Sequence, residues 1–139
     1  MSIKFFFEKN IYLQNRAGLK KFIINIFRSE RKQVKTITYI FCSDKYLLNI
    51  NRGFLNHNYY TDILTFDLSP SPEGPVESEI YISVDRIRDN AAQLNTNIRE
   101  ELLRVIFHGA LHLCGYNDKT KVEIVEMRKK EDHYLSLYV

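Results

Sequence analysis

The sequence predicts one α/β domain in which a mixed sheet of about four strands is covered by about five helices. The chain has 139 residues, which is the size of a single domain, so we assign residues 1–139 to one unit. Hydrophobic residues make up 45% of the chain, which is enough to build a buried core. Strand-like and helix-like segments alternate along most of the chain, as expected for a layered α/β structure.

The N-terminal half alternates between strands and helices. Apolar and aromatic residues predict a strand over Ile3–Glu8, and apolar residues at three- to four-residue spacing predict a helix over Asn15–Arg31. Alternating residues predict a second strand over Val34–Cys42. Since a helix separates these strands, we expect them to be parallel and joined by a right-handed crossover. Ser43 can then cap a helix that runs toward Gly53.

Two strands and three helices are predicted in the C-terminal half. The segments Asp62–Leu68 and Glu79–Val84 have strand character, and all three prolines of the chain lie between them. The proline-rich segment indicates a hairpin-like loop, so we expect this pair of strands to be antiparallel. Helices are predicted over Asp85–Leu94, Asn97–Gly115 and Val122–Leu137.

Composition excludes some classes of protein. A net charge of +3, from 20 Lys and Arg against 17 Asp and Glu, permits a nucleic-acid partner without indicating one. Cys42 and Cys114 are too few for a disulfide framework and lack the spacing of a CxxC motif, so we expect free thiols. No apolar run is long enough to cross a bilayer and no signal peptide is visible, so we expect a cytoplasmic protein with no membrane partner.

His108 and His112 form the clearest chemical motif. They are four residues apart on a predicted helix, which places them about 40° apart around the axis and about 6 Å along it. Both imidazoles can therefore reach one metal ion. Such a pair alone often arises by chance, but Gly115 stands where the helix should end and lets the chain bring Asp118 back to the same ion. Two imidazoles and a carboxylate suit zinc and leave a position for water.

The same spacing occurs in metzincin peptidases, but one difference argues against their reaction. Their motif has a glutamate, the general base, directly after the first histidine, where this chain has Gly109. We therefore predict that the protein is not a peptidase. The remaining histidines are less informative. His133 is expected at the surface of the last helix, and His57 lies in a polar loop, where it is either a surface residue or part of the site.

Residues 108–118 resemble the metal motif of the YbeY family, rRNA maturation factors described as metal-dependent single-strand endoribonucleases. The family pattern is His-Gly-x-Leu-His-Leu-x-Gly-Tyr-Asp-His, and this chain has His-Gly-Ala-Leu-His-Leu-Cys-Gly-Tyr-Asn-Asp. Residues Thr61–Phe66 and Glu79–Ser83 resemble two strand motifs of the family, and Glu100-Glu101 and Arg104-Val105 precede the histidines as they do there. The resemblance covers nearly the whole chain.

The resemblance implies a cytoplasmic, zinc-dependent endoribonuclease that cleaves single-stranded RNA in rRNA maturation and ribosome biogenesis. Its partners would be single-stranded or ribosomal RNA and ribosomal proteins. It would hold one zinc ion per chain, and metal-bound water would be the catalytic group. The expected metal ligands are His108, His112 and Asp118, and the expected substrate-binding residues are Arg52, His57 and Arg104.

Two departures from the family pattern affect these expectations. The third ligand of the family is usually a histidine, whereas this chain has Asp118, which makes a bound metal a weaker Lewis acid. The family also commonly has an arginine at the position of Leu55, where it could stabilise phosphate charge, so we expect slow turnover here. Two alternatives stay open, namely a zinc hydrolase of a small substrate and a non-catalytic, metal-stabilised RNA-binding protein of the ribosome.

Overall fold

One four-stranded mixed sheet organises the molecule. The computed structural model describes residues 1–57 and 60–138. Within them the strands lie in the order β1–β2–β4–β3. β1 pairs with β2 and β2 with β4 in parallel, while β3 and β4 are antiparallel. The bounds of the strands are Ser2–Phe7 for β1, Val34–Cys42 for β2, Ile63–Asp67 for β3 and Val76–Ser83 for β4. The predicted fold class and both predicted strand pairings are confirmed.

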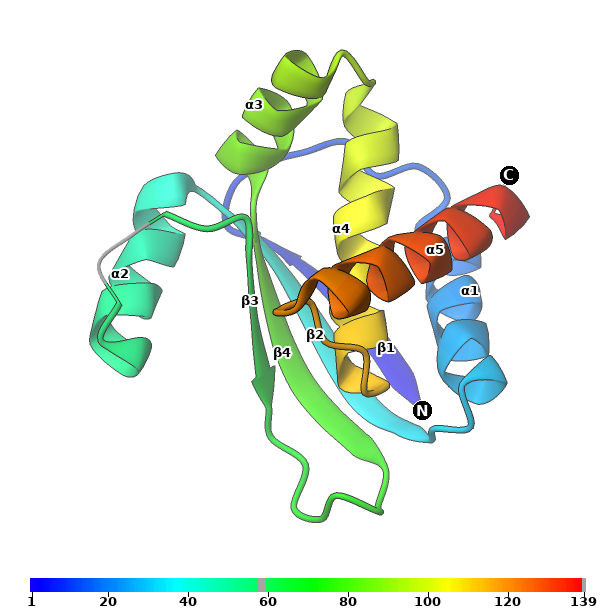
Figure 1. Cartoon of the computed structure of the whole chain (residues 1–139). Helices are drawn as coiled ribbons and strands as arrows, with labels where there is room; N and C mark the ends of the chain where they lie inside the picture. The colour runs from blue at the N-terminus through cyan, green and yellow to red at the C-terminus, as the bar shows by residue number, and fades with distance from the viewer. Residues whose placement is uncertain (58–59, 139) are drawn as a thin grey trace.

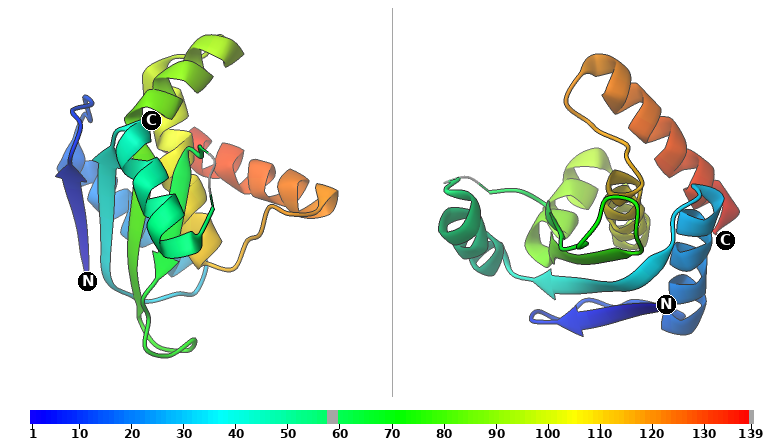
Figure 2. Two further views of the ribbon diagram at one scale, coloured as in Figure 1. Left: turned by 90° about the vertical axis from the view of Figure 1, so that its left-hand side faces the viewer. Right: turned by 90° about the horizontal axis from the view of Figure 1, so that it is seen from below.

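Five helices surround this sheet in the described part of the chain (Figures 1 and 2). Their bounds are Arg16–Ser29 for α1, Asp44–Leu55 for α2, Val84–Leu94 for α3, Ile98–Leu113 for α4 and Lys121–Leu137 for α5. Side-chain oxygens cap all five of them, as expected for Asn, Ser and Thr at a helix start. The caps of α1 to α5 are, in order, Asn15, Ser43, Ser83, Asn97 and Thr120.

The two faces of the sheet bury different sets of side chains. Ile37, Tyr39 and Phe41 of β2 belong to the large core, which also contains buried residues of α1 and α4. Ile40 and Cys42 point to the other face, because successive residues of a strand alternate, and they pack with Leu47 of α2. α1 and α4 therefore cover one face, while α2 covers part of the other (Figure 2).

Most predicted boundaries differ from the structure by one or two residues, and the start of β4 and the end of α2 have clear local causes. β4 begins at Val76, three residues before the predicted start, because the Val76 N–H donates to the carbonyl of Gln33 and continues the pairing beside β2. α2 does not end near Gly53. It continues to Leu55, and Asn56 then adopts a left-handed conformation that ends the helix.

Gly109 lets α4 lie close to the sheet. A Cβ atom at this position would be 3.0 Å from Cδ1 of Ile63 and 3.1 Å from Cγ2 of Ile80. Position 109 therefore faces β3 and β4, and a glutamate there would be directed into the core. This gives a structural reason, besides the missing carboxylate, for the prediction that the protein is not a peptidase.

Cys42 and Cys114 are free thiols, as predicted. Burial raises the pKa of each to about 12. They are therefore protonated thiols at neutral pH, and neither is an activated nucleophile.

None of the helices described is long and apolar enough to cross a membrane.

Candidate functional site

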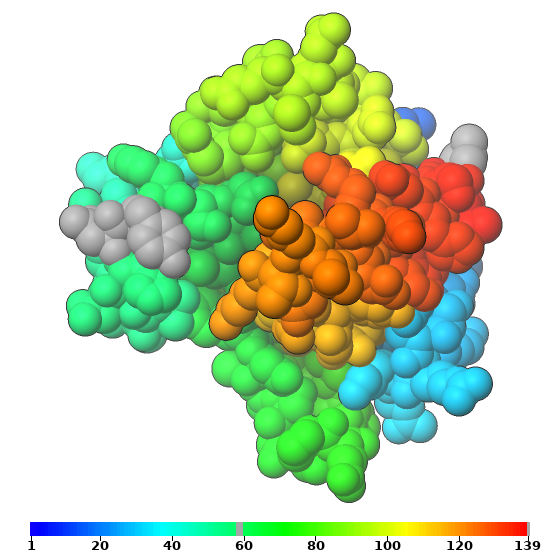
Figure 3. Space-filling model, viewed as in Figure 1, coloured from blue at the N-terminus to red at the C-terminus, as the bar shows by residue number. Residues whose placement is uncertain are grey.

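A groove with a volume of about 460 Å³ runs between α4, α5 and the start of β3. In Figure 3 it is the hollow bounded by α3, by α5 and by the segment that enters β3. The groove is built from side chains that are far apart in the sequence. They include Thr61 and Asp62 before β3, Arg104 and His108 of α4, Asp118 of the turn after α4, and Arg128 and Glu131 of α5.

His108 lies between two carboxylates in this groove. Its Nδ1 is 2.7 Å from Oε2 of Glu131, and its Nε2 is 3.2 Å from Oδ2 of Asp118. Burial alone lowers the pKa of His108, but the hydrogen bond and charge of Glu131, together with Asp118, raise it overall. An imidazole that donates from Nδ1 to a carboxylate presents its Nε2 outward, which is the usual arrangement of a metal-ligating histidine.

Arg104 supports Glu131 from the other side. One guanidinium nitrogen is 3.0 Å from Oε1 of Glu131, and another is 2.7 Å from Oδ1 of Asp132. The Glu131 side chain is only 7% exposed, so Arg104 compensates a carboxylate that is almost removed from water. Arg104 thus lines the groove, but its charge is already paired within the protein. Its predicted contact with RNA stays a prediction.

The turn after α4 carries Asp118 back toward the helix. Gly115 has a φ of 107°, in the region that favours glycine, so the chain reverses direction where the sequence predicted a turn. The two residues that this turn brings together are His108 and Asp118. Their role as metal ligands stays a prediction.

His112 lies on the next turn of α4 and is exposed. Its Nδ1 is 3.2 Å from the backbone carbonyl of Tyr116, which leaves Nε2 available. However, no group of three His, Cys, Asp or Glu side chains in residues 1–57 and 60–138 is arranged to hold a metal ion. The predicted site at the end of the helix is therefore not assembled as a set of three. Two imidazoles and one carboxylate are nevertheless donors that suit zinc. Each imidazole also has an acceptor at its Nδ1, as metal-ligating histidines usually do.

Two further carboxylates of the groove were not predicted as site residues. Burial raises the pKa of Asp62 although the nearby His108 lowers it, and burial, followed by the charge of Asp62, raises the pKa of Glu101. Both carboxyl groups are therefore protonated more readily than an exposed carboxyl, and Asp62 lies near His108. The sequence contained Asp62 only as part of a strand motif and gave no sign that it would lie near a histidine.

The other predicted substrate-binding residues do not line this groove. Arg52 belongs to α2 and His57 to the loop after it, and neither is among the described residues that line the groove. Both interact with other residues of the chain. Residues 58 and 59 of the predicted polar loop lie outside the described residues. Arg128 is the exposed guanidinium in the groove, since 57% of its side chain is accessible. His133 is exposed at the surface, as predicted.

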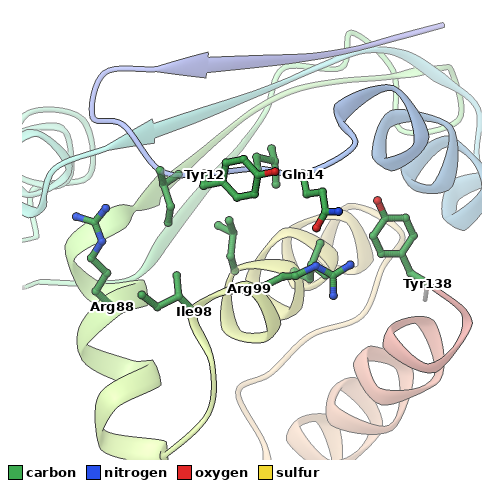
Figure 4. A pocket seen from close by; sticks show the side chains of 10 residues that line it. Tyr12, Gln14, Arg88, Ile98, Arg99 and Tyr138 are labelled. Carbon is green, nitrogen blue, oxygen red and sulfur yellow. The ribbon is translucent and has the colours of Figure 1, made fainter.

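A smaller cavity of about 270 Å³ lies on another side of α4 (Figure 4). Its floor is aliphatic and consists of the buried residues Ile11, Leu13, Leu102 and Leu103. Arg88 and Arg99 are the charged residues that line it, and the described lining includes no imidazole, carboxylate or thiol. It therefore offers neither metal ligands nor a general base, and the groove beside His108 is the candidate site.

Comparison with known proteins gives consistent matches over nearly the whole chain. A family profile described as Endoribonuclease YbeY matches residues 7–139. A protein named Endoribonuclease YbeY from Cytophaga hutchinsonii is 48% identical over 137 residues, which is 98% of this chain and 95% of the relative. Its namesake from Karelsulcia muelleri is 42% identical over 133 residues, 96% of this chain and 93% of the relative.

One solved structure has a similar fold. The solution structure of a protein from Thermotoga maritima superimposes with a TM-score of 0.69 and 25% sequence identity. The match covers 99% of this chain and 91% of the other.

Proposed function

Because the chain belongs to the YbeY endoribonuclease family, we propose that it is a zinc-dependent endoribonuclease that cleaves single-stranded RNA in the cytoplasm during rRNA maturation and ribosome biogenesis. The observation that carries this proposal is the groove in which Nε2 of His108 faces Asp118 while Glu131 holds Nδ1. The match of residues 7–139 to the family supports the reaction, and the donor set supports the metal.

One zinc ion per chain would be held by His108, His112 and Asp118. The chemistry supplied by zinc is Lewis acidity, which stabilises negative charge on a phosphodiester and lowers the pKa of water. Glu131 orients His108, and Tyr116 orients His112 through its backbone carbonyl. Arg104 prevents Glu131 from being an unpaired buried charge. These residues therefore orient the two imidazoles one by one, and zinc binding would still have to bring the three ligands together.

The lining of the groove suits an extended RNA strand. Arg128 is exposed and can contact a phosphate, while Leu94 and Ile124 expose apolar surface that can contact bases, being 61% and 50% accessible. A flexible strand can place its backbone beside His108 and Asp118, whereas a rigid A-form duplex hides its bases. Binding should weaken with added salt, because contacts of Lys and Arg with phosphates release counterions.

The test is cleavage of one end-labelled single-stranded RNA by three samples: the parent protein with zinc, the parent after chelation, and His108→Ala. We expect cleavage by the first sample only, with recovery when zinc is restored to the chelated protein. The variant His133→Ala, which removes an exposed histidine outside the groove, should cleave like the parent. The same RNA annealed into a duplex should be cut more slowly.

Equal cleavage by all three samples would mean that a contaminating nuclease is responsible and would contradict the proposal. A parent protein that binds zinc and RNA without cleaving would instead identify a metal-stabilised RNA-binding protein. Zinc-dependent turnover of small ester or phosphate substrates, without RNA cleavage, would identify a small-substrate hydrolase.

A further inference from the structure

Glu30 collects three hydrogen bonds from the C-terminal part of the chain. It lies directly after α1, and its carboxylate is 2.8 Å from the hydroxyl of Tyr116, 2.5 Å from the hydroxyl of Tyr134 and 3.2 Å from Nζ of Lys130. The Glu30 side chain is only 12% exposed. A single acidic residue outside the groove therefore ties α1 to α5 and to the turn that follows α4.

The carboxylate of Glu30 is held in its charged form. Burial raises the pKa of Glu30, but the hydrogen bonds from Tyr134, Tyr116 and Lys130 lower it overall. The Lys130 ammonium also lies 5.5 Å from the centre of the Tyr116 ring. Tyr116 is thus fixed by a charge-assisted hydrogen bond and by a nearby cation, and both are stronger in a partly buried place than in water.

Tyr116 connects Glu30 to the metal-binding turn. Its backbone carbonyl is the acceptor for Nδ1 of His112 at 3.2 Å, and its N–H donates to the carbonyl of Leu111 at 3.1 Å. Asp118 follows only two residues later. Any movement of Tyr116 would therefore change the partner of His112 and the position of Asp118 together.

We propose that Glu30 is a positioning residue for the zinc site, because it holds the hydroxyl of Tyr116 and thereby fixes the carbonyl that orients His112. This inference rests on the proposed zinc-dependent function. Glu30 contacts neither the substrate groove nor a predicted ligand, so its effect passes through Tyr116.

The chain offers a matched pair of variants for the test. Tyr116→Phe and Tyr134→Phe each remove one hydroxyl group that donates a hydrogen bond to Glu30. Only Tyr116 lies on the turn between His112 and Asp118. Zinc affinity is measured by competition with a chromophoric chelator, and the thermal midpoint of the metal-free protein reports general stability. We expect Tyr116→Phe to weaken zinc binding about 10-fold or more, the size typical of a lost outer hydrogen bond, and Tyr134→Phe to change it by less than about threefold.

Two variants of Glu30 extend the comparison. Glu30→Gln keeps a side-chain oxygen that can accept from Tyr116, whereas Glu30→Ala removes every acceptor. Zinc affinity should therefore fall less in Glu30→Gln than in Glu30→Ala. If Glu30→Ala does not fold, the two tyrosine variants still decide the question.

Equal losses of zinc affinity in Tyr116→Phe and Tyr134→Phe, in proportion to their losses of stability, would overturn the positioning role. The imidazole ¹⁵N resonances of His112 in the metal-free protein give a separate reading. These resonances should shift in Tyr116→Phe and stay unchanged in Tyr134→Phe. The absence of a shift in both variants would also overturn the positioning role of Glu30. If the parent binds no zinc, the proposed function fails, while these resonances still decide whether Glu30 positions His112.

Discussion

At the scale of single residues, hydrogen bonds fix the orientation of the His108 imidazole. His108 donates to Glu131, which is itself held by Arg104, so the imidazole has one defined orientation. Its free nitrogen then faces Asp118. The carboxylate of Asp118 is 44% exposed, and His108 is its one ion-pair partner among the residues that the structure describes, so it can turn toward a cation. Zinc binding, as we propose it, should therefore depend most directly on Asp118.

We predict that Asp118→Ala loses most bound zinc, because it removes the only charged ligand of the proposed set. Asp118→His should retain zinc, since an imidazole is an equally suitable donor. The matched control is Asn117→Ala, which changes the neighbouring residue on the same turn and should bind zinc like the parent. Metal analysis of the purified proteins measures the result. Normal zinc content in Asp118→Ala would show that another residue is the third ligand.

The pKa of Glu30 predicts how stability depends on pH. Because its hydrogen bonds lower the pKa of Glu30 below the ordinary value of 4.5, the charged carboxylate stabilises the folded state. This contribution is complete above the unfolded-state pKa and is lost as the pH falls through the folded-state pKa. Urea unfolding of the metal-free protein between about pH 7 and about pH 3 should show a shallower loss of stability for Glu30→Gln than for the parent. Parallel curves for the two proteins would contradict the assignment.

At the scale of secondary structure, α4 serves two purposes on two faces. Gly109 faces β3 and β4 and allows a close approach, while His108 beside it faces the groove. A helix repeats every 3.6 residues, so neighbouring positions point in different directions. The core contact made at Gly109 therefore sets how far His108 lies from the start of β3. Close packing of this helix is a condition for the geometry of the site.

Replacing Gly109 of α4 or Gly53 of α2 with alanine should have different effects. The Cβ of Gly109→Ala would press on Ile63 and Ile80, whereas the Cβ of Gly53→Ala in α2 would have no neighbour within 4 Å. Both changes gain the same helix propensity, so the difference between the two unfolding free energies reports the effect of packing at position 109. We expect Gly109→Ala to be less stable than Gly53→Ala by about 1–3 kcal/mol, the usual cost of overpacking. Denaturant unfolding measures it, and equal stabilities would show that α4 can move away from the sheet freely.

At the scale of the whole molecule, the groove joins parts of the chain that are remote in sequence. The start of β3, the helix α4, the turn to Asp118 and the helix α5 each contribute a wall or a charged group. His108 and Asp118, two of the proposed ligands, are close together only after α4 and its turn have folded. Zinc should therefore bind the folded chain much more tightly than the unfolded chain, and binding should stabilise the entire domain.

Zinc removal should consequently lower the thermal midpoint of the parent protein. Free zinc at 100 times the dissociation constant would stabilise the folded state by about 2.7 kcal/mol. In His112→Ala this zinc-dependent rise should largely disappear, because one of two imidazole ligands is lost. Thermal unfolding of both proteins with zinc and with a chelator tests this. An equal rise in both proteins would show that His112 is not a ligand.

The sequence by itself determined the features that depend on near neighbours. Apolar spacing and the capping residues Asn15, Ser43 and Asn97 determine where helices begin, because a cap bonds to N–H groups within a few positions. The pairing of His108 with Asp118 was predictable for the same reason. His108 lies on α4 and Asp118 on the turn directly after it, and Gly115 permits the chain to reverse direction between them.

Only the tertiary structure decided the contacts between distant segments. These contacts include the position of β4 between β2 and β3 and the hydrogen bond that His108 donates to Glu131. They also include the burial of Asp62 near His108. The contact of Glu30 with Tyr116 joins residues that are 86 positions apart. Such contacts depend on how whole faces of the helices and sheet pack together, and residue spacing holds no information about that packing. The sequence therefore indicates the side chains that could bind a metal, while the tertiary structure determines which residues hold those side chains in place.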